Sequence, residues 1–196
     1  NASFSSIRPM SASARPALKD GDIVFQTSTS SQSVAVQRAT GSKYSHMGMV
    51  VLRGGQPYVL EAIGTVQYTP LDRWLARGVG RHFVAKRLRD ADTRLTPAGL
   101  ERLHAAANQF AGRPYDLYFG WSDERVYCSE LVWKAYDRGL GIQIGKLQKM
   151  GDFKLSDPAV KAKMRERYGS DAPVAETVVS PVAMFESPLL VTVAEQ

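Results

Sequence analysis

The sequence predicts an α+β protein in which an antiparallel sheet packs against a helix that begins with a cysteine. Three observations lead to this prediction. Short runs rich in Val, Ile and aromatic residues, bounded by Gly, Pro or Arg-Asp breaks, gather in the first half of the chain. Amphipathic helical stretches gather in the second half. The two kinds of element do not alternate regularly, which argues against a parallel doubly wound sheet.

Length and composition are those of one ordinary globular domain. The chain has 196 residues, of which 44% are hydrophobic and 22% charged, a balance that excludes disordered and collagen-like classes. Its longest interior apolar stretch, residues 47–52, is far shorter than the roughly 20 residues of a membrane-spanning helix. The single cysteine, Cys128, excludes an intramolecular disulfide framework and any multi-cysteine zinc or iron–sulfur site.

The chain divides into a short leader and one domain. Residues 1–18 are rich in Ser, Ala, Arg and Pro without an apolar period, which predicts a flexible leader or arm. Its first two residues, Asn1-Ala2, resemble the remnant of an expression tag. Residues 19–196 are expected to form a single domain, because no internal repeat or strong linker interrupts them.

The first half of this domain carries most of the expected strands. Residues 22–26 predict a strand, and Ser30 is expected to cap a helix that runs to about residue 39 and ends at Gly41. Thr69-Pro70 predicts the start of a short helix that stops at Gly78. Further strands are expected at residues 47–52, 58–63 and 82–88.

The second half is predominantly helical. Thr96-Pro97 predicts the start of a longer helix, and Gly112 is its expected stop. One stripe of this helix is apolar and consists of Leu100, Leu103, Ala107 and Phe110. The other expected elements are a helix over residues 128–138 followed by Gly139, a helix from Asp157-Pro158 to Gly169, and a strand over residues 189–194.

Positive charge is concentrated in the first half of the chain. The formal net charge is +6, and residues 1–98 hold 13 Lys and Arg against 6 Asp and Glu. The densest basic segment runs from Arg73 to Arg94, where it could meet nucleic acid, anionic lipid or an acidic cell-wall polymer, or form a solvated face. No nucleic-acid-binding motif accompanies it, so a nucleic-acid partner is not expected. Contact with anionic envelope components stays open.

Searches for common catalytic motifs return no match apart from the cysteine. The chain has no Gly-x-x-x-x-Gly-Lys-Ser/Thr phosphate loop, no Gly-x-Ser-x-Gly serine elbow and no dinucleotide fingerprint. Its three histidines, His46, His82 and His104, are too widely spaced for a His-x-x-x-His metal helix. We therefore expect neither a metal nor an organic cofactor.

Cys128 is placed where the chain turns into a helix, in the segment Tyr127-Cys128-Ser129-Glu130. The unpaired N–H groups and the positive dipole end of a helix N-terminus stabilise a thiolate, and a nearby imidazolium stabilises it further. A buried, inert cysteine packed under the helix is the alternative.

His46 leads into an expected strand within Tyr44-Ser45-His46-Met47-Gly48. Strand alternation projects Tyr44, His46 and Gly48 to one face, where the glycine leaves room beside the ring. His46 is therefore a candidate general base and Tyr44 a candidate substrate contact. A histidine satisfied by structural hydrogen bonds remains the alternative.

Glu61 lies in the middle of an apolar strand, which is costly for a carboxylate without a partner. The far nitrogen of a catalytic histidine would be one partner, making Glu61 the third member of a Cys/His/carboxylate set. An ion pair with a basic residue such as Arg87 is the alternative.

At these residues the sequence resembles a known enzyme group. Gly112-Arg-Pro-Tyr115 and Cys128-Ser129-x-Leu131-Val132 resemble the cysteine segment of NlpC-type, papain-like cell-wall amidases, but here the histidine precedes the cysteine, as in the circularly permuted branch. The chain is similar to the YiiX-like members of that branch over most of residues 19–194. The matching segments are Gly21-Asp22-Ile-Val-Phe-Gln26, Ser30-Ser31-Gln32-Ser33, Tyr44-Ser45-His46, Leu60-Glu61-Ala62, Gly112-x-Pro114-Tyr115-Asp116, Tyr127-Cys128-Ser129-Glu130 and Val178-Val179-Ser180-Pro181.

The resemblance implies a circularly permuted papain-like fold and a role for each site residue. Cys128 would be the nucleophile, His46 the base and then the acid, and Glu61 the residue that orients the histidine. Tyr115 would help the Cys128 backbone N–H to hold the oxyanion. Two residues depart from the ordinary amidase pattern: Tyr127 replaces an aspartate before the cysteine, and Glu130 replaces a glycine after the serine.

The expected function is a cysteine hydrolase that cleaves a peptide or peptidoglycan-related amide through a thioester acyl-enzyme. The permuted branch also resembles acyltransferases and phospholipases, so a lipid or acyl-ester substrate is an alternative. A catalytically inactive envelope-binding module is another. Similarity to exported YiiX proteins implies a periplasmic or cell-envelope location.

Overall fold

The computed structural model describes residues 17–196. Residues 1–16, most of the expected leader, lie outside the described residues. Leu18 already packs against a buried cluster, close to where the sequence predicts that the domain begins.

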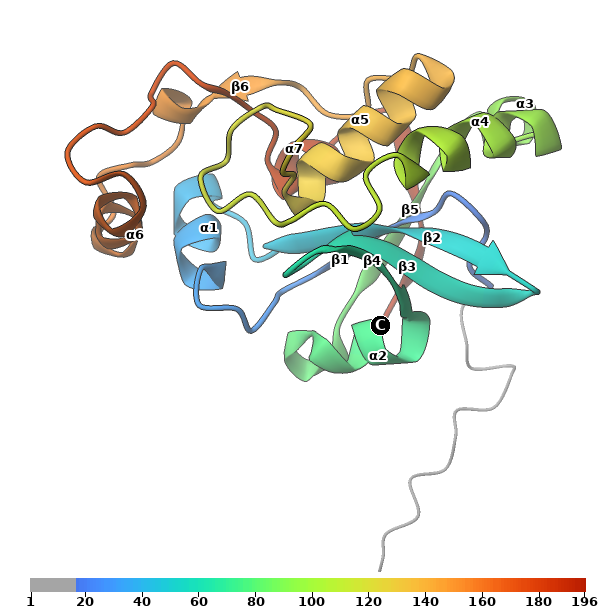
Figure 1. Ribbon diagram of the computed structural model, residues 1–196. Coiled ribbons are helices and arrows are strands. Elements are labelled where there is room, and N and C mark those ends of the chain that lie inside the picture. The colour runs from blue at the N-terminus through green and yellow to red at the C-terminus, as the bar shows by residue number, and fades with distance from the viewer. Residues whose placement is uncertain (1–16) are drawn as a thin grey trace, which may run out of the picture.

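A six-stranded antiparallel sheet forms the centre of the domain (Figure 1). Its strand order is β4-β3-β2-β1-β5-β8, and a separate two-stranded sheet pairs β6 with β7. The strands are β1 Ile23–Gln26, β2 His46–Arg53, β3 Gln56–Ala62, β4 Val66–Pro70, β5 Val84–Leu88, β6 Gln148–Lys149, β7 Thr177–Val178 and β8 Leu190–Glu195.

Helices cover both faces of the large sheet (Figure 1). Helix α5 packs on β2, β3 and α4 on one face, whereas α2 packs on β3 and β4 from the other, and α1 packs on α6 at one end of the sheet. The helices are α1 Ser33–Thr40, α2 Leu71–Arg77, α3 Ala91–Arg94, α4 Pro97–Asn108, α5 Cys128–Leu140, α6 Pro158–Tyr168 and α7 Pro181–Phe185, with short 3₁₀ turns η1 Val79–Arg81 and η2 Met150–Asp152. None of the helices within residues 17–196 is long and apolar enough to cross a bilayer.

Two hydrophobic clusters form because the strands alternate their side chains between the two faces. Met47, Met49 and Leu60 join the larger cluster, which includes much of α5. Val50 and Val59 join the smaller cluster around Trp74 of α2. The larger cluster fixes α5, the helix that carries the cysteine, against the sheet.

Several expected helix boundaries are confirmed. Thr96 caps α4 by accepting a hydrogen bond from Gly99 N, and Asp157 caps α6 by accepting from Ala159 N and Val160 N. Ser180, whose role the sequence did not define, caps α7 through Ala183 N.

Other boundaries differ from the sequence prediction. Helix α1 begins at Ser33 rather than at Ser30, and no side chain caps it. Helix α5 continues through Gly139 to Leu140 and ends at Gly141, which has the left-handed backbone conformation (φ 67°). Gly41 ends α1 in the same conformation (φ 69°), as expected. Glycine in a helix interior lowers helix stability, but here it lets two helices approach each other. A Cβ on Gly139 would lie 2.9 Å from the backbone of Arg102 in α4, so only glycine allows this close packing.

The strand β4 is absent from the prediction. The residues before the expected helix at Thr69-Pro70 pair with β3 as far as Pro70, and α2 begins only at Leu71. β4 lies at the edge of the sheet, where a terminal proline is tolerated because its missing N–H removes no inner ladder bond.

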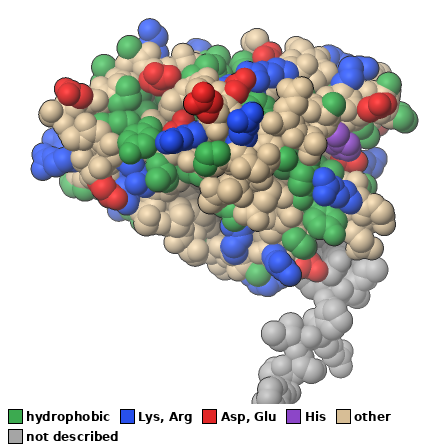
Figure 2. Space-filling model, viewed as in Figure 1, with side chains coloured by type: hydrophobic (Ala, Val, Ile, Leu, Met, Phe, Trp, Pro, Cys, Tyr) green, Lys and Arg blue, Asp and Glu red, His purple; other side chains and the backbone are tan. Residues whose placement is uncertain are grey.

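The basic segment from Arg73 to Arg94 is largely engaged in contacts within the protein. Five of its basic side chains donate hydrogen bonds within the fold: Arg77 to Glu61, Lys86 to the Phe185 carbonyl, Arg87 to Asp22, Arg89 to the Pro188 carbonyl and Arg94 to the Leu140 carbonyl. On the face shown in Figure 2, basic side chains are interspersed with acidic ones. Much of this segment therefore helps to hold the fold together.

Candidate active site

Cys128 is the first residue of α5 and is 5% exposed. Because it occupies the first turn, its backbone N–H has no acceptor within the helix. The turn before it is held by Glu130, which accepts a hydrogen bond from Tyr127 N at 3.2 Å. Ser129 donates to the Val179 carbonyl at 2.7 Å, so the start of α5 is fixed in position.

His46 is the first residue of β2 and is 6% exposed. Its Nε2 lies 2.8 Å from Glu61 Oε1, and the ring also hydrogen-bonds Cys128. The Trp74 ring, with its centroid 6.2 Å from the imidazole, packs beside it. His46 therefore lies between the thiol and the carboxylate.

Glu61 is fully buried in β3, next to β2. Besides His46, the Arg77 guanidinium and the Thr69 hydroxyl donate hydrogen bonds to it. The alternative pairing with Arg87 is wrong, because Arg87 instead binds Asp22 through Nε at 2.7 Å. The carboxylate thus has both kinds of partner that the sequence offered as alternatives, a histidine and an arginine.

Gly48 allows β3 to approach β2 closely. A Cβ at this position would lie 2.4 Å from Val59 Cγ1 and 2.8 Å from the Leu60 carbonyl oxygen. The space that the sequence assigned to the histidine ring is therefore occupied by the strand that carries Glu61. A larger residue at position 48 would push this strand, and its carboxylate, away from His46.

The ionisation of the buried pair follows from these contacts. Burial lowers the pKa of His46, but hydrogen bonds and charge interactions with Cys128 and Glu61 outweigh burial and raise the pKa from 6.5 to about 9. Burial raises the pKa of Glu61, but hydrogen bonds from His46, Arg77 and Thr69 outweigh it and hold the pKa below 4.5. At neutral pH the protonated ring of His46 therefore lies between the Cys128 side chain and an ionised Glu61.

Tyr115 lies beside Cys128, as the resemblance implied. Burial, with a further contribution from the charge at Cys128, raises the pKa of its phenol well above 10, so the hydroxyl keeps its proton. Gln32 Nε2 donates to the Tyr115 oxygen at 2.7 Å. Because this bond uses an oxygen lone pair, the phenolic proton can be donated to another acceptor.

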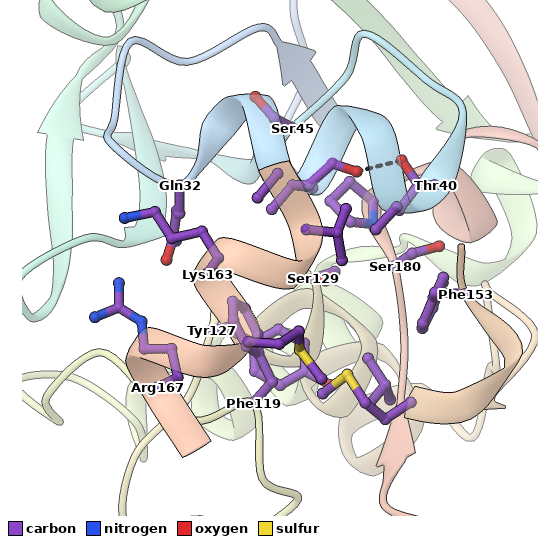
Figure 3. Close-up of a pocket in the computed structure, with 18 of the residues that line it drawn as sticks. Gln32, Thr40, Ser45, Phe119, Tyr127, Ser129, Phe153, Lys163, Arg167 and Ser180 are labelled. Atoms are coloured by element: carbon purple, nitrogen blue, oxygen red, sulfur yellow. Dashed lines mark hydrogen bonds between the residues drawn. The ribbon is translucent and has the colours of Figure 1, made fainter. Parts of the chain in front are cut away.

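Two adjoining cavities border these residues. One, of about 110 Å³, is lined mainly by apolar side chains (Figure 3), and Cys128 is among the residues that line it. The other, of about 490 Å³, is lined by several serines and other polar residues together with Ala62, Ile63 and Leu117, and includes His46. The residues shared by both linings are Gln32, Ser45, Tyr115 and Arg167. We call the two together the cleft; the nucleophile lines one side of it and the base lines the other.

Tyr44 does not take the expected position. It lines neither cavity, its hydroxyl hydrogen-bonds His82 Nε2 at 3.1 Å, and its ring stacks on Phe185 with centroids 4.4 Å apart. The expectation that Tyr44 contacts substrate is wrong, because Tyr44 precedes β2 and packs in the larger hydrophobic cluster.

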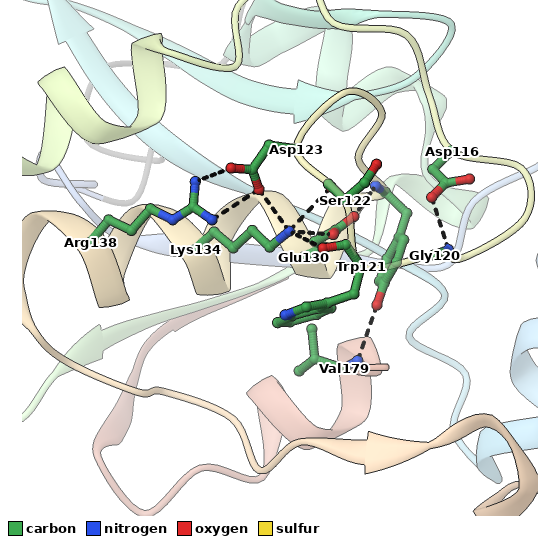
Figure 4. Close-up of polar contacts among 10 residues, drawn as sticks. Asp116, Gly120, Trp121, Ser122, Asp123, Glu130, Lys134, Arg138 and Val179 are labelled. Carbon is green, nitrogen blue, oxygen red and sulfur yellow. Dashed lines mark hydrogen bonds and ion pairs between the residues drawn. The ribbon is translucent and has the colours of Figure 1, made fainter. Parts of the chain in front are cut away.

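The loop over residues 116–123 is fixed to α5 by a second polar cluster (Figure 4). Lys134 Nζ donates to Trp121 O at 2.9 Å, to Asp123 Oδ1 at 3.0 Å and to Glu130 Oε2 at 2.7 Å. Asp116 accepts hydrogen bonds from Tyr118 N and Gly120 N within the loop. This loop follows Tyr115 and brings Phe119 into the wall of the apolar cavity.

The two departures from the amidase pattern have structural roles. Glu130 joins the cluster with Lys134, and the Tyr127 hydroxyl accepts a hydrogen bond from Val179 N at 3.2 Å. Val179 lines the apolar cavity, so Tyr127 ties a wall of that cavity to the start of α5.

Sequence reasoning missed several residues of the site. Gln32 belongs to one of the matching segments but has no role in the sequence prediction. Arg77 appears there only as part of the basic segment from Arg73 to Arg94, and Arg167 is not considered. Thr69 was read as the start of a helix. No local signal could identify them, because each reaches the site from an element distant in sequence.

Comparisons with known proteins agree with this geometry. Residues 17–194 match the family described as "Permuted papain-like amidase enzyme, YaeF/YiiX, C92 family". The "Uncharacterized protein YiiX" of Escherichia coli (strain K12) is 49% identical over 176 residues, which cover 90% of this chain and 86% of that protein. The crystal structure of "metalloprotein yiiX" from Escherichia coli O157:H7 has a TM-score of 0.87 and 49% identity, over 91% of this chain and 97% of that one.

The side chains of the present site do not form a set of converging metal ligands. Within residues 17–196, no group of three or more His, Cys, Asp or Glu side chains is arranged to hold a metal ion. Glu61 binds His46 through Nε2, while Cys128 interacts with the same ring, so the imidazole separates the other two groups. The word metalloprotein belongs to the description of the Escherichia coli O157:H7 structure and is not applied to this chain.

These matches confirm the circularly permuted papain-like fold and the general class of cysteine hydrolase. The histidine strand precedes the cysteine helix in the chain, as expected for the permuted order. With its antiparallel sheet packed on a cysteine-bearing helix, this chain belongs to the permuted papain-like amidase family, YaeF/YiiX.

Proposed function

We propose that the protein cleaves an amide bond, in a peptide or a peptidoglycan-related substrate, through a thioester acyl-enzyme. The observation that carries the proposal is the position of His46 between Cys128 and Glu61. Cys128 is the nucleophile, His46 moves the proton, and Glu61 orients the ring and stabilises its protonated form.

The first half-reaction transfers the acyl group to sulfur. The Cys128 thiolate, whose proton resides on His46, attacks the carbonyl carbon and forms a carbon–sulfur bond. The Cys128 N–H and the Tyr115 hydroxyl donate hydrogen bonds to the resulting oxyanion. When the oxyanion collapses, the carbon–nitrogen bond breaks and His46 donates its proton to the leaving amine.

The second half-reaction releases the acid. Neutral His46 takes a proton from water, and the oxygen attacks the thioester carbonyl. The carbon–sulfur bond then breaks, the carboxylic acid leaves, and the thiolate–imidazolium pair is restored. Arg77 and Thr69 keep Glu61 ionised throughout the cycle.

The proposal is tested by trapping the acyl-enzyme. Incubation with muropeptides and with short acyl amides, followed by intact-protein mass spectrometry, is expected to show an acyl adduct on Cys128. Cys128→Ala should abolish both adduct and product. Substrate binding without adduct or turnover in the native protein would instead identify an envelope-binding module.

A lipid or acyl-ester hydrolase or acyltransferase on the same three side chains is the second candidate. The apolar lining of the cavity next to Cys128 favours it. Comparing kcat/KM for acyl esters and for amides with the same acyl group separates the two. Added amine or alcohol acceptors then distinguish transfer from hydrolysis, because only transfer gives a new acylated product.

A periplasmic or cell-envelope location, with contact to anionic envelope components, is part of the same proposal. Fractionation of cells that express the full gene is the direct test. Salt-dependent binding to anionic vesicles, compared with neutral vesicles, tests the contact.

A further inference from the structure

The backbone of Tyr115 is held beside the start of α5. Its N–H donates to the Gly64 carbonyl at 3.1 Å, and a parallel β-bridge pairs it with Val126, two residues before Cys128. Its side chain lines both cavities of the cleft. These contacts fix the residue near the thiol, but they do not set the direction in which its O–H bond points.

Gln32 sets that direction. Within the part of the chain that the structure describes, it is the one hydrogen-bond partner of the Tyr115 hydroxyl, and its Nε2 donates at 2.7 Å. An amide nitrogen only donates, so the phenol oxygen accepts and its proton points elsewhere. That proton is left for an acceptor in the cleft, such as the oxyanion that forms when Cys128 attacks a carbonyl.

The two possible orientations of the Gln32 amide have opposite consequences. If Oε1 faced Tyr115, the phenol would donate its proton to Gln32 and have none for the oxyanion. In the observed orientation Nε2 faces Tyr115, and Oε1 is buried without a hydrogen-bond partner among residues 17–196. Unpaired buried polar atoms are uncommon in folded proteins, and they are the kind of local cost that functional sites carry.

The contact with Tyr115 is not a by-product of how α1 begins. Gln32 immediately precedes α1 and borders the cavity (Figure 3), yet its side chain makes no capping hydrogen bond to that helix. The start of α1 is held instead by Ser33, whose Oγ lies 2.7 Å from Ser45 Oγ. Because Ser45 precedes His46, the same bond places the amide of Gln32 relative to the catalytic base.

We propose that Gln32 is a positioning residue: by donating to the Tyr115 oxygen, it keeps the phenolic proton directed at the oxyanion. The inference rests on the proposed function and on the role of Tyr115 in it. It adds a residue that acts through the tyrosine, and no bond of the substrate forms or breaks at Gln32.

Two substitutions separate this role from a purely structural one. Gln32→Met keeps the length of the side chain and removes the hydrogen bond. Gln32→Glu keeps a hydrogen bond but reverses it, because an ionised carboxylate only accepts and would take the phenolic proton. If the bond merely held α1 to Tyr115, Gln32→Glu would be the milder change. Under the proposal it is the more severe one.

Hydrolysis of p-nitrophenyl acetate, after subtraction of the rate of Cys128→Ala, measures the difference. Loss of one oxyanion donor costs about 10²- to 10³-fold, so Tyr115→Phe and Gln32→Glu should each lower kcat/KM by that range. Gln32→Met leaves the phenol free to turn and still reach the oxyanion, so its loss should be about three- to tenfold. The matched controls Gln109→Met and Gln109→Glu, at an exposed position after α4, should lose less than about threefold.

A double-mutant cycle removes the effect of the added charge. In the Tyr115→Phe protein there is no phenolic proton to capture, so adding Gln32→Glu or Gln32→Met should give kcat/KM values within about threefold of each other. If Gln32→Glu stayed about tenfold worse than Gln32→Met in this background, its charge and not the proton direction would be the cause, and the inference would be overturned.

Alkylation of the single cysteine by iodoacetamide is a reaction without an oxyanion, because sulfur displaces iodide at a saturated carbon. Gln32→Met should change this rate by less than about threefold, since the thiol and His46 are untouched. Equal losses of alkylation and hydrolysis in Gln32→Met, or a Gln32→Glu protein at least as active as Gln32→Met, would overturn the inference and leave the proposed function intact. Hydrolysis that survives Cys128→Ala undiminished would overturn the proposed function itself.

Discussion

Two buried carboxylates in this protein meet cationic partners, but they behave differently. Glu61 accepts hydrogen bonds from His46 and Arg77, and these contacts hold its pKa below 4.5 although burial opposes them. Glu130 accepts from Lys134 and Tyr127 N, yet burial dominates and raises its pKa to about 8. Both side chains are fully buried, so burial alone does not explain the difference.

The surroundings of His46 and Lys134, the cationic partners, distinguish a candidate active site from a structural cluster. We call the cluster of Glu130, Lys134, Asp123 and Arg138 the clamp. His46 borders a cavity and reaches a thiol, so a proton can move between the pair and a substrate. Lys134 is enclosed by the Trp121 and Ser122 carbonyls and by Asp123 (Figure 4). A buried ion pair therefore indicates chemistry only when one member also faces a nucleophile and an open cavity.

The largest expected effect is on catalysis when the histidine is removed. His46→Ala should lower kcat/KM by at least about 10⁴-fold, because the thiol loses its base and the leaving amine its acid. Steady-state amide cleavage measures the loss. His82→Ala is the matched control, since His82 binds Tyr44 outside the cleft, and its kcat/KM should stay within about threefold of the native value.

Glutamine substitutions compare the two carboxylates directly. Glu61→Gln should lower kcat by between about 10²- and 10⁴-fold, because the ring loses the charge that orients it and stabilises its proton. Glu130→Gln should change kcat of the folded protein by less than about threefold. Comparable losses in the two variants would show that both clusters serve catalysis, contrary to the distinction drawn above.

Removing the cation of the clamp, Lys134, should affect stability more than catalysis. Lys134→Met removes the hydrogen-bond donor to Glu130 and to the loop at residues 121–123, and should lower the free energy of unfolding by about 2–3 kcal/mol through the buried acceptors left without a donor. Glu130, with a pKa of about 8, is mostly protonated at neutral pH and does not become an unpaired buried charge. Urea denaturation measures this change. The kcat per folded molecule should fall much less than in Glu61→Gln, and a tenfold or greater fall would make the loop part of the catalytic machinery.

The pH dependence of His46 sharpens the comparison further. Its folded-state pKa, about 9, is above the ordinary 6.5, so its contribution to stability is complete below pH 6.5 and is lost as the pH rises through 9. The activity should likewise fall about tenfold per pH unit above 9, because the leaving amine then finds no proton. NMR titration of the ring is the direct measurement.

Two variants check the cause of this titration. Glu61→Gln and Cys128→Ala each remove a group that raises the pKa of His46, so the ring should titrate at a lower pH in both. An unchanged midpoint in Glu61→Gln would contradict the assigned role of the carboxylate. Glu130→Gln should leave the midpoint where it is in the native protein.

The smallest expected effect concerns the exposed edge of the clamp. Arg138 forms a bidentate ion pair with Asp123, but both side chains are substantially exposed. Arg138→Gln should lower the free energy of unfolding by no more than about 1 kcal/mol, because water screens such pairs. A loss as large as that of Lys134→Met would show that the surface pair, and not the buried lysine, holds the loop.

Much of the fold was predictable because its signals are local. Short runs rich in Val, Ile and aromatic residues identified β1, β2 and β3, and the Thr-Pro and Asp-Pro pairs identified the starts of α4 and α6. Edge strand β4 was missed, since its run is short and its Thr69-Pro70 pair predicts the start of a helix. The start of α1 was misplaced because several serines in a row offered equivalent caps.

The sequence by itself determined the chemical groups and their local placement: a cysteine at a helix start, a histidine at a strand start and a carboxylate in an apolar strand. Tertiary structure decided that Arg77, and not Arg87, binds Glu61, that Gln32 binds Tyr115, that Tyr44 lies outside the cleft, and that the two cavities differ in polarity. Backbone periodicity is set by neighbours a few residues apart, whereas the partner of a buried side chain depends on which distant elements pack against it.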